Sequence, residues 1–267
     1  MMEKRHTIAL LTDFGDMDSY VAEVKGVILS INSNANIIDI THKIEPQDIL
    51  HASLMLKRSV YFFPRETTFL CIVDPDVGTS RGIIFIETDN YNFIAPDNGL
   101  LWLTANELDV NRVVKLENHN YFISSAPSTF EGRDKMAPVA AYSSLGVEPT
   151  QFGSIQNGIV HLGLPETIIE NDLLIGEIIY FDNFGNAITN ITFENLMENE
   201  AVNLPDVYFN SHKVGHIVST FSDVNNGTPV AYFGSSGFLE LAINRGDFRS
   251  AMQAKTHDKV TVRYGKK

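Results

Sequence analysis

The sequence is poor in cysteine and in long apolar runs, although 44% of its 267 residues are hydrophobic. A lone Cys71 cannot form an internal disulfide, and its place within the apolar run 69–73 predicts a buried, unreactive thiol. A membrane helix needs ~18 continuous apolar residues, and the first apolar run, Ile8–Leu11, is also too short for a signal peptide. We therefore expect a cytoplasmic protein with no membrane partner.

Positive charge is scarce as well. Lys and Arg number 20 against 33 Asp and Glu, which gives a net charge of −13, and no cluster of basic residues stands out. This composition argues against a nucleic-acid partner, because phosphate backbones are bound by grouped Lys and Arg. The negative charge suits a cationic small ligand, although solubility alone explains it equally well.

Several common catalytic motifs are missing. The chain has no G-x-G-x-x-G, Walker or H-E-x-x-H sequence, so nicotinamide and P-loop chemistry have no support. His212 and His216 have a four-residue spacing but no neighbouring Glu or Cys, so we interpret them as solvent-facing strand residues. No metal site is predicted.

Residues 1–165 have the pattern of an α/β domain. Short β-rich apolar runs alternate with segments of helical period, which is typical of a parallel sheet covered by helices. Helices are expected over 21–31, after Pro46 to Val60, and over 134–145. The expected strands are Ile8–Leu11, Ile37–Ile40, Thr68–Val73, Ile83–Glu87 and Val113–Leu116.

Residues 172–267 have a different texture, with strands joined by Gly, Asn and Asp turns and little helix between them. This pattern predicts a second domain, a small antiparallel β-barrel or sandwich. Its expected strands are Ile175–Tyr180, Ala187–Phe193, Val207–Phe209, Ile217–Phe221, Val230–Phe233, Leu239–Ile243 and Val260–Val262.

Two carboxylates stand directly after expected strands, on loops that contain glycine. Asp13 follows the strand at Ile8–Leu11, and Asp74 follows the run that ends at Val73. Ligands of open α/β sheets bind beyond the carboxyl ends of the strands, so both positions are candidate site positions. Either Asp alone is explained equally well as a turn or helix cap, but their joint occurrence favours a site.

Two other polar segments have simpler explanations. Asp97-Asn98-Gly99 precedes an apolar run, and a tight turn or helix cap accounts for it. The segment from Ser128 to Asp134 precedes the third helix and is either a capped loop or a charged site loop.

A magnesium-dependent phosphatase is a competing interpretation. Asp74 and Asp76 form an Asp-x-Asp pair after a strand, with one carboxylate as nucleophile and the other as acid. The later acidic pair that this chemistry also needs is missing, because Gly246-Asp247-Phe248 offers only one carboxylate.

Seven segments in fixed order make a composite pattern. They are Thr12-Asp13-Phe14-Gly15, Asp39-Ile40-Thr41-His42, Val73-Asp74-Pro75-x-Val77-Gly78-Thr79-x-Arg81, Ala95-Pro96-Asp97-Asn98-Gly99-Leu100-Leu101, Ser128-Thr129-Phe130-x-Gly132-Arg133-Asp134, Asp182-x-Phe184-Gly185-Asn186-x-x-Thr189-Asn190 and Gly234-Ser235-Ser236-Gly237. Over residues 7–263 the chain thereby resembles the S-adenosylmethionine (SAM) hydrolases that release adenosine, which are related to the SAM-dependent fluorinase and chlorinase.

This resemblance implies a Rossmann-like α/β/α domain followed by a β-barrel. It also implies a homotrimer that binds SAM between the N-terminal domain of one subunit and the C-terminal domain of its neighbour. Water attacks ribose C5′ and methionine leaves, with SAM as substrate and no cofactor. The implied substrate-binding residues are Asp13 for the ribose hydroxyls, Phe184 and Asn186 for adenine, and Asp182, Ser235 and Ser236 for the ends of methionine, together with Phe130.

The catalytic set departs from the family at one position. Asp74 and Arg81 match two members of a water-orienting Asp-Arg-His set, but Glu131 stands where the hydrolases have histidine; Asp76 replaces a usual glycine. Sulfonium leaves without acid help, so the main task is to hold water in line with the C–S bond. Glu131 then accepts the water proton as histidine does, with Arg81 separating the two carboxylates.

One other outcome remains open for this site. A second negative charge that draws Arg81 out of place would leave a weakly active or non-catalytic SAM or adenosine binder. Halogenation is disfavoured, because anionic Asp74 and Glu131 repel halide.

Overall fold

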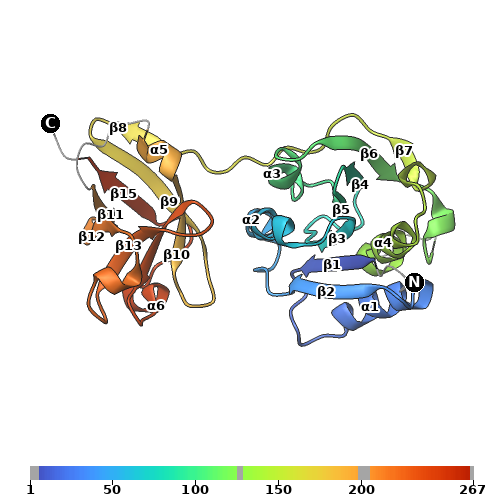
Figure 1. Ribbon diagram of the computed structural model, residues 1–267, viewed down its shortest axis with the longest axis horizontal. Coiled ribbons are helices and arrows are strands. Elements are labelled where there is room, and N and C mark those ends of the chain that lie inside the picture. The colour runs from blue at the N-terminus through green and yellow to red at the C-terminus, as the bar shows by residue number, and fades with distance from the viewer. Residues whose placement is uncertain (1–5, 125–128, 198–204, 265–267) are drawn as a thin grey trace. The chain divides into compact units, whose positions relative to one another are not determined.

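The computed structural model describes residues 6–124, 129–197 and 205–264, so Ser128 of the predicted site loop lies outside the described residues. The chain divides into two compact units, residues 1–163 and 164–267, each of which is described by itself (Figure 1). No helix in the described ranges is long and apolar enough to cross a bilayer.

The first unit is a mixed α/β domain. Its strands are β1 (Thr7–Thr12), β2 (Asn36–Thr41), β3 (Thr67–Ile72), β4 (Ile83–Thr88), β5 (Tyr91–Pro96), β6 (Val110–Leu116) and β7 (Gly153–Ile155). Its α-helices are α1 (Tyr20–Ile31), α2 (Ile49–Ser59), α3 (Trp102–Ala105) and α4 (Ala137–Ser144). Short helical turns are η1 (Val60–Phe62), η2 (His119–Tyr121), the π-helical η3 (Gly132–Met136) and η4 (Pro149–Gln151).

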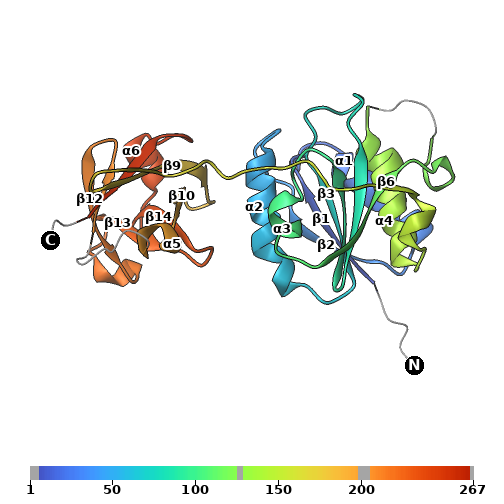
Figure 2. The same ribbon diagram turned by 90° about the horizontal axis from the view of Figure 1, so that it is seen from above.

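The seven strands form one sheet in the order β2-β1-β3-β5-β4-β6-β7. The pairs from β2 to β5 are parallel, and those from β5 to β7 are antiparallel. Helices α1 and α4 cover one face, while α2 and α3 cover the other (Figure 2). The Rossmann-like three-layer prediction is therefore correct, but the sheet is parallel in only half of its extent.

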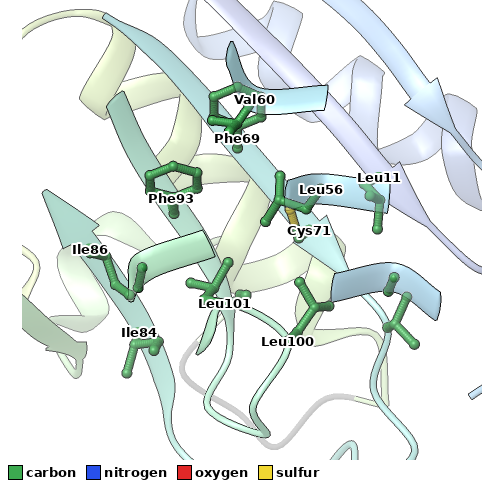
Figure 3. Close-up of a cluster of buried hydrophobic side chains, with 14 of the residues drawn as sticks. Leu11, Leu56, Val60, Phe69, Cys71, Ile84, Ile86, Phe93, Leu100 and Leu101 are labelled. Carbon is green, nitrogen blue, oxygen red and sulfur yellow. The ribbon is translucent and has the colours of Figure 1, made fainter. Parts of the chain in front are cut away.

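The inner strands are buried on both faces, which explains their continuous apolar sequence. In β1, Ala9 and Leu11 pack in the α2 and α3 layer, whereas the alternate residues Ile8 and Leu10 pack toward α1 and α4. Figure 3 shows the first of these layers, with Cys71 enclosed among its apolar side chains. Burial raises the pKa of the Cys71 thiol, which confirms the buried, unreactive cysteine.

The second unit is a β-barrel. Its strands are β8 (Ile168–Glu170), β9 (Leu173–Phe181), β10 (Ala187–Thr192), β11 (Asp206–Phe209), β12 (His212–Val218), β13 (Pro229–Phe233), β14 (Phe238–Ile243) and β15 (Lys259–Arg263). Its helices are α5 (Phe193–Met197), η5 (Phe221–Asp223) and α6 (Phe248–Met252). The order β10-β14-β13-β12-β11-β15-β9 closes through the pairing of β9 with β10, around one apolar core.

Two details of the barrel differ from the sequence prediction. The pair β12–β13 is parallel, while the other neighbouring pairs around the closed ring are antiparallel. The strand predicted at Ile217–Phe221 is correct only for Ile217 and Val218, which end β12, because a capping box between Thr220 and Asp223 starts a helical turn beyond them. Strand β12 begins earlier, at His212, and it carries His212 and His216 exposed, as expected.

Candidate active site

The chain reverses its direction of travel across the sheet between β1 and β3. From β1 it passes through α1 to β2 on one side, and then through α2 to β3 on the other side of β1. Such a switch point leaves a crevice beyond the carboxyl ends of the two central strands, where ligands of open α/β sheets bind. Asp13 stands directly after β1, and Asp74 stands two residues after the end of β3.

Arg81 joins the two carboxylates that the sequence placed in the catalytic set. Its Nε donates to Asp74 Oδ1 at 2.7 Å, and its Nη2 contacts Asp74 Oδ2 and donates to Glu131 Oε2 at 2.7 Å. The side chains of Asp74, Arg81 and Glu131 are only 8%, 9% and 10% exposed. A guanidinium that donates to both oxygens of a carboxylate fixes the distance between the two groups and the plane in which they lie. The low exposure of the side chains strengthens these hydrogen bonds.

A π-helical turn brings Glu131 to this cluster. Glu131 immediately precedes η3, and Gly132 is pressed against the last residue of β3, since a Cβ there would lie 3.0 Å from two carbon atoms of Ile72. Glycine lets the start of the turn approach the strand this closely without displacing the Ile72 side chain. Asp74 follows the same strand two residues later, which explains why Glu131 meets Arg81, 50 positions before it, beside Asp74.

Lys135 is a member of this cluster that the sequence analysis missed. Its Nζ contacts Glu131 Oε1, so each oxygen of Glu131 has a cationic donor. The available signal was the spacing, because residues four apart on a helix face the same side and opposite charges there attract. The cluster thus holds two carboxylates and two cations.

The loop after β1 is fixed by groups from the loop after β2. Asp13 Oδ2 accepts a hydrogen bond from the backbone N–H of Gln47 at 2.9 Å, and the N–H of Gly15 donates to the carbonyl of His42 at 2.7 Å. The ring of His42 bonds Thr12 Oγ1 through Nδ1 at 2.9 Å. Within the described residues Asp13 bonds Gln47, and no hydrogen bond or ion pair links it to Arg81.

Phe130 connects the site loop to the loop after β1. Its ring makes edge contacts with Phe14 and Tyr20, with centroids 5.5 and 5.3 Å apart, and the Arg133 guanidinium lies 5.0 Å from its centroid. Arg133 also donates to Asp134 and to Glu23 of α1. These contacts hold the residue before Glu131 against the segment that carries Asp13.

The remaining candidates in this unit have structural roles. Asn98 Oδ1 accepts from the N–H of Leu100 at 3.2 Å, as expected of a turn, and Asn98 Nδ2 donates to the carbonyl of Val73 at 2.9 Å. Asp97 accepts from Gln156 and from the N–H of Val160. Asp76 is exposed and is not among the residues with positive φ, so replacing the usual glycine causes no strain there.

These contacts also bear on the phosphatase interpretation. Both oxygens of Asp74 are engaged by Arg81, whereas a nucleophilic carboxylate needs an accessible oxygen. The described ranges contain no group of three or more His, Cys, Asp or Glu side chains arranged to hold a metal ion. The phosphatase alternative is therefore not favoured.

In the second unit, Asp182 organises the turn between β9 and β10. Its Oδ1 accepts from the N–H groups of Phe184 and Asn186, both at 2.9 Å, and its Oδ2 accepts from Asn186 Nδ2 at 2.8 Å. Asn186 is buried, whereas the Phe184 ring is 74% exposed. The turn thus presents an aromatic face next to a fixed amide.

The loop between β13 and β14 carries the two predicted serines. Ser235 is exposed, and the buried Ser236 Oγ has no hydrogen-bond partner among the described residues. Gly234 begins this loop against the buried Glu240, whose Oε2 accepts from Tyr232 at 2.6 Å. A buried hydroxyl without a partner is costly unless a ligand or water satisfies it.

Gly185→Ala tests how tightly the Asp182 turn is built. Gly185 has φ +79°, and an added Cβ would lie 2.0 Å from Asp247 Oδ1. We expect the free energy of unfolding to fall by about 2–4 kcal/mol, because overpacking adds to the cost of the left-handed backbone.

Gly237→Ala is the matched control, because Gly237 has φ +80° and no atom within 4 Å of the added Cβ. For this variant we expect the free energy of unfolding to fall by only about 1–2 kcal/mol, the cost of the left-handed backbone without a steric clash. Urea unfolding of both full-length variants measures the difference, and equal losses would contradict the steric contact.

Comparison with known proteins gives concordant matches along the chain. The model of the SAM hydroxide adenosyltransferase N-terminal domain matches residues 8–153, and that of the C-terminal domain matches residues 176–261. A protein of Thermus thermophilus named (R)-S-adenosyl-L-methionine hydrolase is 33% identical over 93% of this chain and 96% of its own length. One of the same name from Salinispora arenicola is 31% identical over 97% and 98%. A crystal structure of an uncharacterized conserved protein from Thermotoga maritima has a TM-score of 0.86 at 37% identity, covering 96% of this chain and 99% of that chain.

Proposed function

The chain belongs to the SAM hydroxide adenosyltransferase family, and we propose that it is an enzyme that hydrolyses S-adenosyl-L-methionine through water attack at ribose C5′. The observation that carries this proposal is the meeting of Asp74 and Glu131 at Arg81, beyond the carboxyl ends of β1 and β3. A cluster of that kind orients a water molecule and accepts a proton from it.

The proposed reaction needs no cofactor. The water oxygen forms a bond to C5′ while the C5′–S bond breaks, and sulfur keeps the bonding electron pair as the neutral thioether of methionine. Glu131 accepts the proton of the attacking water and returns it to solvent, while Asp74 and Arg81 orient that water. The products are adenosine and L-methionine.

The proposed substrate contacts follow the chemistry of each group. Asp13 takes the ribose hydroxyls beside Phe130, since an ionised carboxylate accepts from two donors. In the barrel unit, Phe184 stacks on adenine and the amide of Asn186 bonds its edge. Asp182 has about four acceptor positions, three of them used within its turn, and the last suits the methionine ammonium. Ser235 and Ser236 take the methionine carboxylate, which would satisfy the buried hydroxyl of Ser236.

Hydrolysis in ¹⁸O-labelled water tests the reaction. The purified full-length protein is incubated with SAM, and the products are analysed by mass spectrometry beside a sample without enzyme. We expect one ¹⁸O atom in the 5′-hydroxyl of adenosine and none in methionine. Intact SAM after prolonged incubation would refute hydrolysis, and adenosine without the label would refute water attack at C5′.

We further propose that the protein acts in the cytoplasm as a homotrimer with shared sites. Light scattering should then give three times the 29.8 kDa mass of the chain. An Asp74→Asn subunit mixed with an Asn186→Ala subunit should recover activity at about a quarter of the sites, because each contributing subunit has an even chance of carrying the intact half. No recovery in mixed trimers, with each parent trimer assembled, would place every site within one subunit.

A further inference from the structure

We infer that Lys135 is a positioning residue for Glu131, an inference that rests on the proposed hydrolysis. Lys135 lies within η3, four residues after Glu131, and its Nζ contacts Glu131 Oε1. The other oxygen of Glu131 accepts from Arg81 Nη2 at 2.7 Å. The carboxylate that receives the water proton is therefore held from both sides by cations on different segments of the chain.

Charge balance gives Lys135 its first role. Asp74 and Glu131 are two nearly buried carboxylates that share the single guanidinium of Arg81. One cation leaves a net negative charge in this region, and the two anions then compete for Arg81. Lys135 supplies the second positive charge from the side of Glu131 that Arg81 does not reach. Arg81 can then keep both of its contacts to Asp74 while it also touches Glu131.

Orientation gives Lys135 its second role. The terminal torsion of a Glu side chain is broad, so a carboxylate held at one oxygen is less firmly fixed in plane than one held at both. Donors at both oxygens fix its plane, and the remaining lone pairs then point in set directions. Since the reacting water must lie in line with the breaking bond, a fixed acceptor plane contributes to rate more than to substrate affinity.

The backbone supports this placement. The start of η3 is pressed against β3 at Gly132, and the contacts of Arg133 to Glu23 and Asp134 hold the same turn against α1. The side chain of Lys135 is 21% exposed, so its methylene stem is largely covered while its ammonium reaches the carboxylate.

The test compares Lys135→Met with Lys135→Arg. Methionine keeps an unbranched stem without the charge, and arginine keeps the charge. We expect Lys135→Met to lower kcat about 10-fold or more while KM changes less than about twofold, because orientation of the reacting groups is lost and binding is not. Lys135→Arg should recover most of kcat. Lys57→Met, which removes a surface ion pair to Glu107, is the control that leaves both constants unchanged.

The same substitution in a Glu131→His background separates positioning from a general structural effect. An uncharged imidazole has no need of a cationic partner, so Lys135→Met should change kcat there by less than about twofold. If Glu131→His is inactive, the kcat values of Lys135→Met and Lys135→Arg in the otherwise wild-type protein test the role of Lys135. Wild-type kcat in Lys135→Met, or a loss that Arg does not reverse, overturns the role of Lys135 alone. A wild-type protein that never hydrolyses SAM overturns the proposed function, and this inference with it.

Discussion

Arg81→Met lowers turnover of SAM by about 10³-fold and weakens the folded state. The guanidinium donates to both catalytic carboxylates, and loss of a preorganised charged donor costs rates of this order. The substitution also leaves Asp74 and Glu131, both nearly buried, without their shared cation. Removing one partner of a buried ion pair costs about 3–5 kcal/mol, so the free energy of unfolding should fall by that amount.

Two variants complete this experiment, which measures product formation and urea unfolding on the same preparations. Arg81→Lys keeps the charge but not the two-point contact, so it should recover stability more than turnover. Arg112→Met removes the ion pair to Glu87 across β6 and β4, where both groups are more exposed, and it should cost at most about 1 kcal/mol. Wild-type turnover and stability in Arg81→Met would show that the cluster is not the site.

Burial on both faces made the centre of the first unit predictable from the sequence. The runs at β1 and β3 are continuously apolar because side chains of alternate residues pack into different layers. Asp13 and Asp74 were predictable because carboxyl ends of parallel strands meet at one edge. The meeting of Asp74 with Glu131 was not available from periodicity, because it depends on Gly132 against Ile72 and was expected only from the family resemblance.

The missed elements have local causes. Strand β5 was not predicted because Pro96 and the turn at Asp97 interrupt the alternation of residues that indicates a strand. The short connection at Asp89-Asn90 pairs β5 antiparallel to β4. A parallel crossover needs a longer connection, so the helix-between-strands pattern fails there. Lys135 was missed because its charge looks like an ordinary exposed helix residue until Glu131 is placed at Arg81.

Glu131→Gln lowers kcat by about 10²–10⁴-fold with little change in KM, because an amide cannot accept the proton of the attacking water. The amide also fits its surroundings poorly. Both oxygens of Glu131 accept from cations, so the NH₂ group of glutamine must face either Arg81 or Lys135, donor against donor.

Glu131→His separates the chemistry of proton acceptance from the shape of the site. A neutral imidazole accepts a proton, so this variant should keep turnover within about 10-fold of the wild type. Its rate should fall as the pH drops through the pKa of the new histidine, because the protonated ring no longer accepts. The wild type, measured in the same buffers, is the reference for this loss.

Values of kcat between about pH 5.5 and 8.5, taken with saturating SAM, decide between the interpretations of Glu131. A Glu131→Gln enzyme as fast as the wild type would move proton acceptance to Asp74 or to solvent, and Arg81 would then act on Asp74 alone. If the wild type does not turn over SAM and the Glu131→His variant does, the native protein binds SAM without hydrolysing it, and Glu131 is the residue that prevents turnover. A carboxylate that takes the role of histidine requires two results together. The Glu131→Gln variant must be slow, and the Glu131→His variant must be active with a rate that depends on pH where that of the wild type does not.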